Sequence, residues 1–281
     1  MTIAEIRGKI SDTNLSEMRE DLLTSDIFGS FRYLPPSTGV LPFLQTAKTI
    51  DGRPFALDME VQHVHWSFWP WLNRKGYSDC EPDVVIGLEG DEHRTHVVMI
   101  EAKYWSPKSN SKEGDDSEGK DDSPGDQLAK ELDCLQGVRP TDLKWDSKLS
   151  IVSRDLVFVT EHVVLPRPDI SESLEAYRLK NNAESPIYWT TWRLLPRIIE
   201  RQIAGTSDVY QRNVLEDMLQ LLRRKALTMF EGIDPVTTYF PREKFAFYFS
   251  GPKVNVYKWP RFSPIPEEVL AYRYRRGAHA R

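Results

Sequence analysis

The sequence predicts an α/β fold, in which the apolar strands of a buried sheet alternate with amphipathic helices. Short runs rich in aliphatic and aromatic residues have the composition of strands that are covered on both faces. They span residues 83–88, 96–104, 155–160 and 186–192. Segments with apolar residues at helical spacing precede, separate and follow these runs. The predicted architecture is therefore a sheet with helices packed against it.

The N-terminal part is expected to supply one helix and one further strand. Residues 13–31 predict a helix because apolar side chains recur every three or four positions, as at Leu15, Met18, Leu22 and Leu23. Residues 34–56 are rich in Pro, Thr and Gly and predict an irregular connection. Alternation of polar and apolar residues within 58–69 predicts a strand before the pair at 83–88 and 96–104.

Three helices are predicted after residue 125. Leu128, Leu132 and Leu135 form the apolar stripe of a helix over 126–135, and further helices are expected over 194–203 and 207–231. From residue 235 the sequence is aromatic and interrupted by prolines, with one short strand expected at 245–249 and a basic tail after it. We expect a domain over 1–205, followed over 206–281 by a C-terminal helix and an appendage of unknown role with helical and β character.

Residues 106–125 contain no aliphatic or aromatic side chain. Such a segment cannot bury enough apolar surface to fold by itself, so a disordered surface loop is expected. The loop directly follows Lys103-Tyr104-Trp105. Two interpretations of this loop stay open. It is either an insertion without a function or an acidic flap that becomes ordered when substrate binds at a nearby site.

Composition limits the classes of protein to consider. The chain has 281 residues, of which 40% are hydrophobic and 28% are charged, and it has two cysteines and a net charge of −5. No apolar run has the length of a membrane span, and the first residues lack the apolar core of a signal peptide. We therefore expect a cytoplasmic protein with no membrane partner. The negative charge disfavours non-specific wrapping of nucleic acid, although a local basic groove remains compatible with it.

Charged residues stand at unusual places in the paired strands. Asp83 opens the first strand, and Glu101 and Lys103 end the second. Alternation along a strand puts Glu101 and Lys103 on one face and Ala102 on the other. Burying such charges is costly unless they are paired or bind a metal ion. An ion pair between Lys103 and Glu101 at a sheet edge is the structural alternative.

The same residues suit the hydrolysis of a phosphodiester. Two carboxylates at facing strand ends can bind a hard divalent cation, and the carbonyl oxygen of Ala102 can add a ligand. Metal ions stabilise the attacking and leaving oxygens of such a reaction. A nearby lysine can orient the attacking water or offset charge on the phosphate.

Pro82-Asp83 followed by Glu101-Ala102-Lys103 resembles the motif of the PD-(D/E)XK nuclease superfamily. A Glu-x-Lys triplet alone is weakly specific, since Glu118-Gly119-Lys120 also fits it, but that triplet lies outside any pair of apolar strands. The resemblance covers about residues 13–195 and does not place 196–281. It implies a restriction-endonuclease-like fold, with an αβββαβ core and a mixed central sheet flanked by helices. The predicted elements follow that order.

The resemblance also implies roles for individual residues. Asp83 and Glu101 would be metal ligands together with the oxygen of Ala102, and Lys103 would be the catalytic lysine. The cofactor would be Mg²⁺ or Mn²⁺.

Two helices contribute to the implied site. Many members place a glutamate of the first helix near the metal; Glu20 is the first choice here and Glu17 the second. Gln127 fits the glutamine of a Gln-x-x-x-Tyr motif and joins the catalytic set. Glu131 stands where that motif has tyrosine.

The function expected from these residues is metal-dependent hydrolysis of DNA. Stand-alone nucleases of this resemblance are common in bacterial defence against phage, which is an association and not a deduction. Two alternatives stay open: an RNA-directed nuclease, and a catalytically inactive member that binds nucleic acid or protein. A homodimer is a further open alternative.

Overall fold

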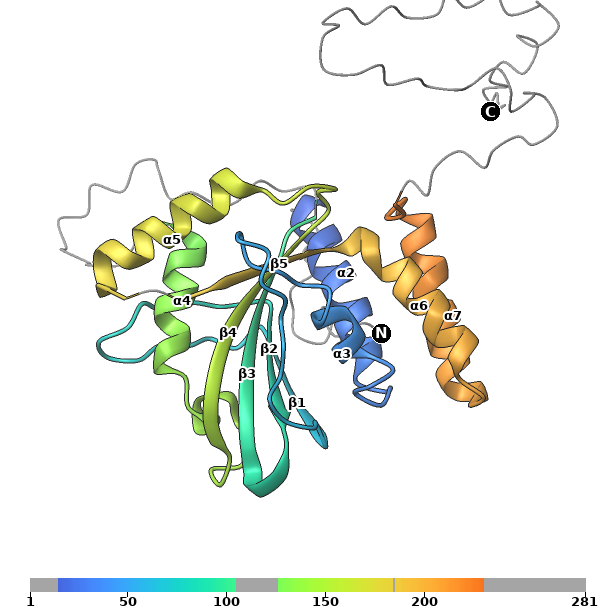
Figure 1. Ribbon diagram of the computed structural model, residues 1–281, viewed down its shortest axis with the longest axis horizontal. Coiled ribbons are helices and arrows are strands. Elements are labelled where there is room, and N and C mark those ends of the chain that lie inside the picture. The colour runs from blue at the N-terminus through green and yellow to red at the C-terminus, as the bar shows by residue number, and fades with distance from the viewer. Residues whose placement is uncertain (1–14, 105–125, 184, 230–281) are drawn as a thin grey trace, which may run out of the picture. The chain divides into compact units, whose positions relative to one another are not determined.

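The centre of the protein is a five-stranded mixed open sheet (Figure 1). The computed structural model describes residues 15–104, 126–183 and 185–229, with side chains from residue 20 onward. The strands lie in the order of the chain: β1 (His63–Phe68), β2 (Val84–Glu89), β3 (Arg94–Ala102), β4 (Ser150–Thr160) and β5 (Ile187–Thr191). The predicted α/β class and mixed sheet are confirmed.

Strand direction changes at β3. Strands β1, β2 and β3 are antiparallel neighbours, whereas β3, β4 and β5 run parallel. Parallel neighbours need a crossover connection. Helix α4 (Gln127–Gly137) is part of the connection from β3 to β4, and helix α5 (Arg167–Asn181) is part of the connection from β4 to β5.

Side chains that alternate along the strands pack into two separate hydrophobic cores, one on each face of the sheet. Val84, Ile86, Val98 and Ile100 belong to the core with α2 (Leu15–Phe31), α3 (Val40–Leu44), α6 (Leu195–Gly205) and α7 (Val209–Arg224). Val85, Val97, Met99 and Leu156 belong to the core with α4 and α5. Figure 1 shows these two groups of helices on opposite sides of the sheet. Continuous apolar strands are thus explained by helices that cover both faces.

Helix α4 begins where its sequence provides a cap. The Asp126 carboxylate accepts a hydrogen bond from the backbone N–H of Ala129 at 3.0 Å, as an N-cap does. Leu128, Leu132 and Leu135 are fully buried. The predicted apolar stripe is confirmed, and it fixes which face of α4 meets the sheet.

Helix α7 packs into the same core as the sheet. It begins at Val209, two residues after the start expected at 207, because the Asp208 carboxylate caps it by accepting hydrogen bonds from the N–H groups of Tyr210 and Gln211. Leu215, Met218 and Leu222 are buried in the core of α2 and α6. Helix α7 therefore belongs to the same compact unit as the sheet.

Two helices differ from the expectation. Helix α5 was not predicted because it is mostly polar, with Ile170, Leu174 and Tyr177 providing a short apolar face. Helix α3 lies inside 34–56, where the sequence predicts irregular chain. The loop at 106–125, the strand at 245–249 and the basic tail lie outside the described residues. Within the described ranges, no helix is both long and apolar enough to span a bilayer.

Glu89 at the end of β2 is held by two histidines. His65 Nε2 and His93 Nδ1 each lie 2.7 Å from one of its carboxylate oxygens. Burial alone raises the pKa of Glu89, but hydrogen bonds from His93 and His65 outweigh it, so the pKa lies below its ordinary value of 4.5.

The contacts of α7 predict that it is needed for stability. Leu222→Ala removes a fully buried side chain and is expected to lower the free energy of unfolding by about 2–5 kcal/mol. Gln220→Ala, at an exposed position of the same helix, is expected to change it by less than about 0.5 kcal/mol. Denaturant unfolding of both variants measures this. Equal effects would contradict the packing of α7 in the core.

The contacts of Glu89 predict a pH-dependent stability. A carboxyl group whose pKa is lowered in the folded state stabilises the protein above its unfolded pKa, and that contribution is lost as pH falls through the folded pKa. Glu89→Gln should therefore lower Tm at pH 6–7, and the difference should shrink as pH falls below 4.5 and vanish once pH is below the lowered folded pKa. Thermal melts at several pH values test this, with Glu92→Gln in the adjacent turn as the control. A Tm difference independent of pH would exclude the histidine contacts as its cause.

Candidate functional site

The strand register brings Asp83 and Glu101 level with each other. Val84 pairs with Ile100 in the antiparallel β2–β3 ladder. Asp83, just before β2, therefore lies opposite Glu101, the residue after Ile100 in β3. By alternation both side chains point to the face covered by α4. Glu101 is 2% exposed and Asp83 is 8% exposed. Two carboxylates from segments 18 positions apart in sequence are thus buried beside one another.

Asp83 is fixed by two donors. One carboxylate oxygen accepts the backbone N–H of Ala102 at 2.8 Å, and the other accepts the indole N–H of Trp69 at 3.2 Å. The Trp69 backbone N–H in turn donates to the Asp83 carbonyl at 2.9 Å. These bonds tie the start of β2 to the end of β3 and hold the carboxylate in one orientation.

Lys103 links two carboxylates from different elements. Its Nζ lies 2.6 Å from Oε1 of Glu101 and 3.3 Å from Oε1 of Glu20. The main chain of Lys103 is also anchored: its N–H donates to the Val159 carbonyl at 2.7 Å, and the indole N–H of Trp192 donates to its carbonyl at 3.2 Å. The lysine lies just beyond the end of β3, and these two hydrogen bonds hold its main chain in place.

Helix α2 delivers Glu20 to this group. The other oxygen of Glu20 accepts the backbone N–H of Tyr104 at 2.9 Å. Ile27 and Phe28, farther along α2, are fully buried in the core, and this packing sets the helix against the sheet. Glu20, the first choice from the sequence, contacts Lys103 and Tyr104. The side chain of Glu17, the second choice, lies outside the described residues.

Helix α4 contributes Gln127 and Glu131. The amide Nε2 of Gln127 donates to Oε1 of Glu101 and, at 3.2 Å, to Oε1 of Glu131. Glu131 is 2% exposed. The sequence drew attention to Glu131 only as a departure from the tyrosine of the motif. Its spacing of four residues from Gln127, on the side of the helix that carries Leu128 and Leu132, was the available indication that it is buried beside Gln127.

Buried acidic groups dominate the electrostatics. Burial, followed by the charge of Glu101, raises the pKa of Asp83 well above 3.8. Burial, followed by the charge and hydrogen bond of Glu101, likewise raises the pKa of Glu131 well above 4.5. Burial alone lowers the pKa of Lys103, but Glu101, Glu20 and Asp83 outweigh it and keep the lysine charged. Lys103 is thus a cation among buried acidic groups, two of which hold their protons more tightly than an exposed carboxyl does.

The chemistry of these donors fits a hard divalent cation. Asp83 and Glu101 supply carboxyl oxygens, which Mg²⁺ and Mn²⁺ prefer as ligands. In the described part of the chain, no three His, Cys, Asp or Glu side chains already surround one point as metal ligands would. The predicted ligands are the Asp83 and Glu101 carboxyl groups and the Ala102 carbonyl, and both Lys103 and Gln127 contact Glu101.

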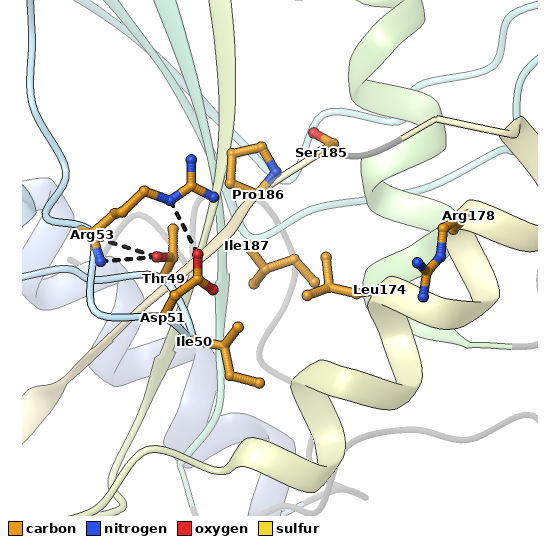
Figure 2. Close-up of a pocket in the computed structure, with 9 residues that line it drawn as sticks. All are labelled: Thr49, Ile50, Asp51, Arg53, Leu174, Arg178, Ser185, Pro186 and Ile187. Atoms are coloured by element: carbon orange, nitrogen blue, oxygen red, sulfur yellow. Dashed lines mark hydrogen bonds and ion pairs between the residues drawn. The ribbon is translucent and has the colours of Figure 1, made fainter.

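A separate cavity lies between the loop before β1 and helix α5 (Figure 2). Its floor is apolar, with Ile50, Leu174 and Ile187, and Figure 2 shows Arg53 and Arg178 on opposite sides of it. Arg53 is paired with Asp51 at 3.2 Å. None of the acidic residues described above lines this cavity, and it adds no group to their chemistry.

Comparison of the chain with protein-family models, with curated proteins and with solved structures finds no match. The functional interpretation therefore depends on the geometry and chemistry of these residues.

The ion pairs of Lys103 predict how its removal affects stability. Lys103→Met leaves Glu20 and Glu101 without this cation, so Tm should fall in cation-free buffer. The raised pKa of Lys103 keeps its stabilising contribution present across pH 5–8. The variant must instead neutralise its carboxylates with protons, so its deficit should be larger at pH 8 than at pH 5. Thermal melts at both pH values test this.

Lys75→Met is the matched control, because Lys75 is exposed. A Tm of Lys103→Met equal to that of Lys75→Met at pH 8 would contradict the inferred role of the ion pairs.

Proposed function

We propose that this protein has the restriction-endonuclease-like fold and is a metal-dependent nuclease that hydrolyses DNA. The observation that carries the proposal is the contact of Lys103 with Glu101, level with Asp83, at adjoining ends of β2 and β3. Elements of the expected αβββαβ order surround it. Gln127 and Glu20 contact the same residues from two helices.

The environment of these groups supports catalysis better than a structural ion pair. One ammonium group would suffice to pair with one carboxylate, whereas Asp83 and Glu131 are buried nearby with raised pKa values. Clusters of buried groups with perturbed pKa values are typical of functional sites. If these buried acidic groups had no function, apolar side chains in their place would make the fold more stable.

Each residue has a distinct part in the proposed reaction. Asp83, Glu101 and the Ala102 carbonyl would hold the cation, which when bound stabilises the attacking and leaving oxygens of the phosphodiester. Lys103, whose ammonium stays charged, would orient the attacking water and offset negative charge on the phosphate. Gln127 would fix the orientation of Glu101, and Glu20 would fix that of Lys103.

A second candidate is a protein that keeps the fold and binds nucleic acid or protein without cleaving it. This candidate is favoured by the hydrogen bonds that Asp83 accepts from Ala102 and Trp69. They give Asp83 a structural role, connecting the start of β2 to the end of β3, that requires no catalysis. RNA is the alternative substrate, since phosphodiester chemistry is shared by both nucleic acids.

Cleavage of nucleic acid tests the proposal directly. Supercoiled plasmid and linear DNA are incubated with the full chain and Mg²⁺ or Mn²⁺, with single-stranded RNA in parallel. Asp83→Asn and Lys103→Met are expected to lower the rate of DNA cleavage by roughly 10²–10⁴-fold, the range typical of a lost acid–base or charge-stabilising group.

The matched controls are Asp217→Asn and Lys75→Met, which remove the same charges from exposed positions and should cleave at the wild-type rate. Equal cleavage by all five proteins would assign the activity to a contaminant and overturn the proposal. Cleavage of RNA alone would replace DNA with RNA as substrate. Binding without cleavage under either metal would favour the non-catalytic candidate.

A further inference from the structure

An exposed tryptophan follows closely after Trp69, the residue that holds Asp83. Trp71 is 66% exposed. An indole at the surface forgoes the free energy that burial of its large apolar area would provide. Asp83 and Glu101 are themselves almost inaccessible, so exposed side chains beside them must supply the contacts that bind a substrate. Every other tryptophan of the described ranges is buried or half-buried: Trp66, Trp69, Trp145, Trp189 and Trp192.

The ladder between β1 and β2 continues past the ends of both strands and places Trp71. Its next pair is Trp69 and Asp83, joined by a backbone hydrogen bond of 2.9 Å. In the same register, Leu72 and Cys80 exchange two more backbone hydrogen bonds, of 2.9 and 3.0 Å. Trp71 lies between these pairs on the first segment. It is therefore two positions along from the residue that is paired with Asp83.

The segment that follows Trp71 is tied to two helices. The backbone N–H of Ser78 donates to the Asp133 carboxylate of α4 at 2.6 Å. Lys180 of α5 contacts the same carboxylate at 2.9 Å and donates to the Ser78 hydroxyl at 3.1 Å. The ladder that carries Trp71 is thus held at both ends, by Asp83 and by these contacts. An exposed side chain on a fixed backbone loses less conformational entropy when a ligand binds to it.

The charge beside Trp71 decides which part of a nucleic acid fits there. The register of the ladder puts Glu81 opposite Trp71, and Glu81 is exposed. A carboxylate at this place repels phosphate. The face of a base is uncharged, and it stacks on an aromatic ring whatever its sequence. Inside a DNA duplex both faces of every base are covered by its neighbours, so Trp71 can reach only an unpaired or terminal base.

We propose that Trp71 stacks on an unpaired base of the substrate, close to the phosphodiester that Asp83 and Glu101 would help to cleave. The protein then binds single-stranded DNA in preference to intact duplex. This inference rests on the proposed function, because the phosphate at Asp83 and Glu101 is what brings the base to Trp71. One aromatic face thereby adds a structural preference to chemistry that is common to all phosphodiesters.

Binding of labelled DNA to the full chain tests the inference. Fluorescence anisotropy is measured in EDTA, which prevents metal-dependent cleavage, with a dye-labelled dT oligonucleotide and a blunt DNA duplex as probes. Trp71→Ala should weaken binding of the single strand about 5–100-fold, the range typical of one lost stack between a base and an aromatic ring. Duplex affinity should stay nearly unchanged. Trp71→Phe keeps an aromatic face and should retain most of the affinity for the single strand.

Tyr210→Ala is the matched control, because Tyr210 is an aromatic residue that is 79% exposed, on helix α7. This variant should bind both probes as the wild type does. Thermal melts of all variants accompany the binding data. Since the Trp71 side chain is largely exposed, Trp71→Ala should melt near the wild-type Tm, and its loss of binding would then not come from unfolding.

Each outcome bears on a separate conclusion. Equal affinity of wild type and Trp71→Ala for the single strand overturns the inference and leaves the proposed function to the cleavage experiment. Binding of neither probe by the wild type also overturns it and points to a protein as the partner of Trp71. A loss for both probes with a lower Tm assigns Trp71 a structural role. A loss confined to the single strand supports the inference, and in a protein that cleaves no nucleic acid it does so while overturning the proposed nuclease.

Discussion

The burial of Lys103 among carboxylates is the interaction on which the arrangement of the site depends. Glu20 comes from a helix on one face of the sheet, and Glu101 points toward the other face, yet one ammonium contacts both. Removing charges from water is costly unless each finds a partner. The position of Lys103 just past the end of β3 lets a single long side chain satisfy this requirement from both layers. Helices α2 and α4 are therefore connected electrostatically through the strand between them.

The second constraint is the register of β2 against β3. A shift of one residue would turn Asp83 toward the opposite face and separate it from Glu101. The register is fixed by alternating apolar side chains that enter two different cores. It is reinforced at the site itself, where the Asp83 carboxylate accepts the N–H of Ala102. The packing of the two cores and the placement of Asp83 beside Glu101 thus depend on the same ladder, so substitutions in Val84–Ile86 would affect both.

Much of this could be predicted from sequence because the decisive patterns are local. Strand alternation put Glu101 and Lys103 on one face, and the leucines of α4 predicted its buried stripe. Glu131 was harder to interpret, because its burial depends on how the α4 crossover packs on the sheet. The same limit applies to α7: the apolar face was visible, but the surface that it covers was not. Helix α5 was missed because three apolar residues in a polar segment give a weak periodicity.

The distribution of the site along the chain has a consequence for biosynthesis. Strands β1, β2 and β3 form by neighbouring antiparallel contacts, so Asp83 and Glu101 can meet early. The anchors of Lys103 come from Val159 and Trp192, which are translated much later and pair through long-range contacts that form slowly. An incomplete chain on the ribosome therefore carries the acidic pair without the anchored lysine. Completion of the parallel half of the sheet is the step at which a nascent chain would acquire its full set of proposed catalytic groups.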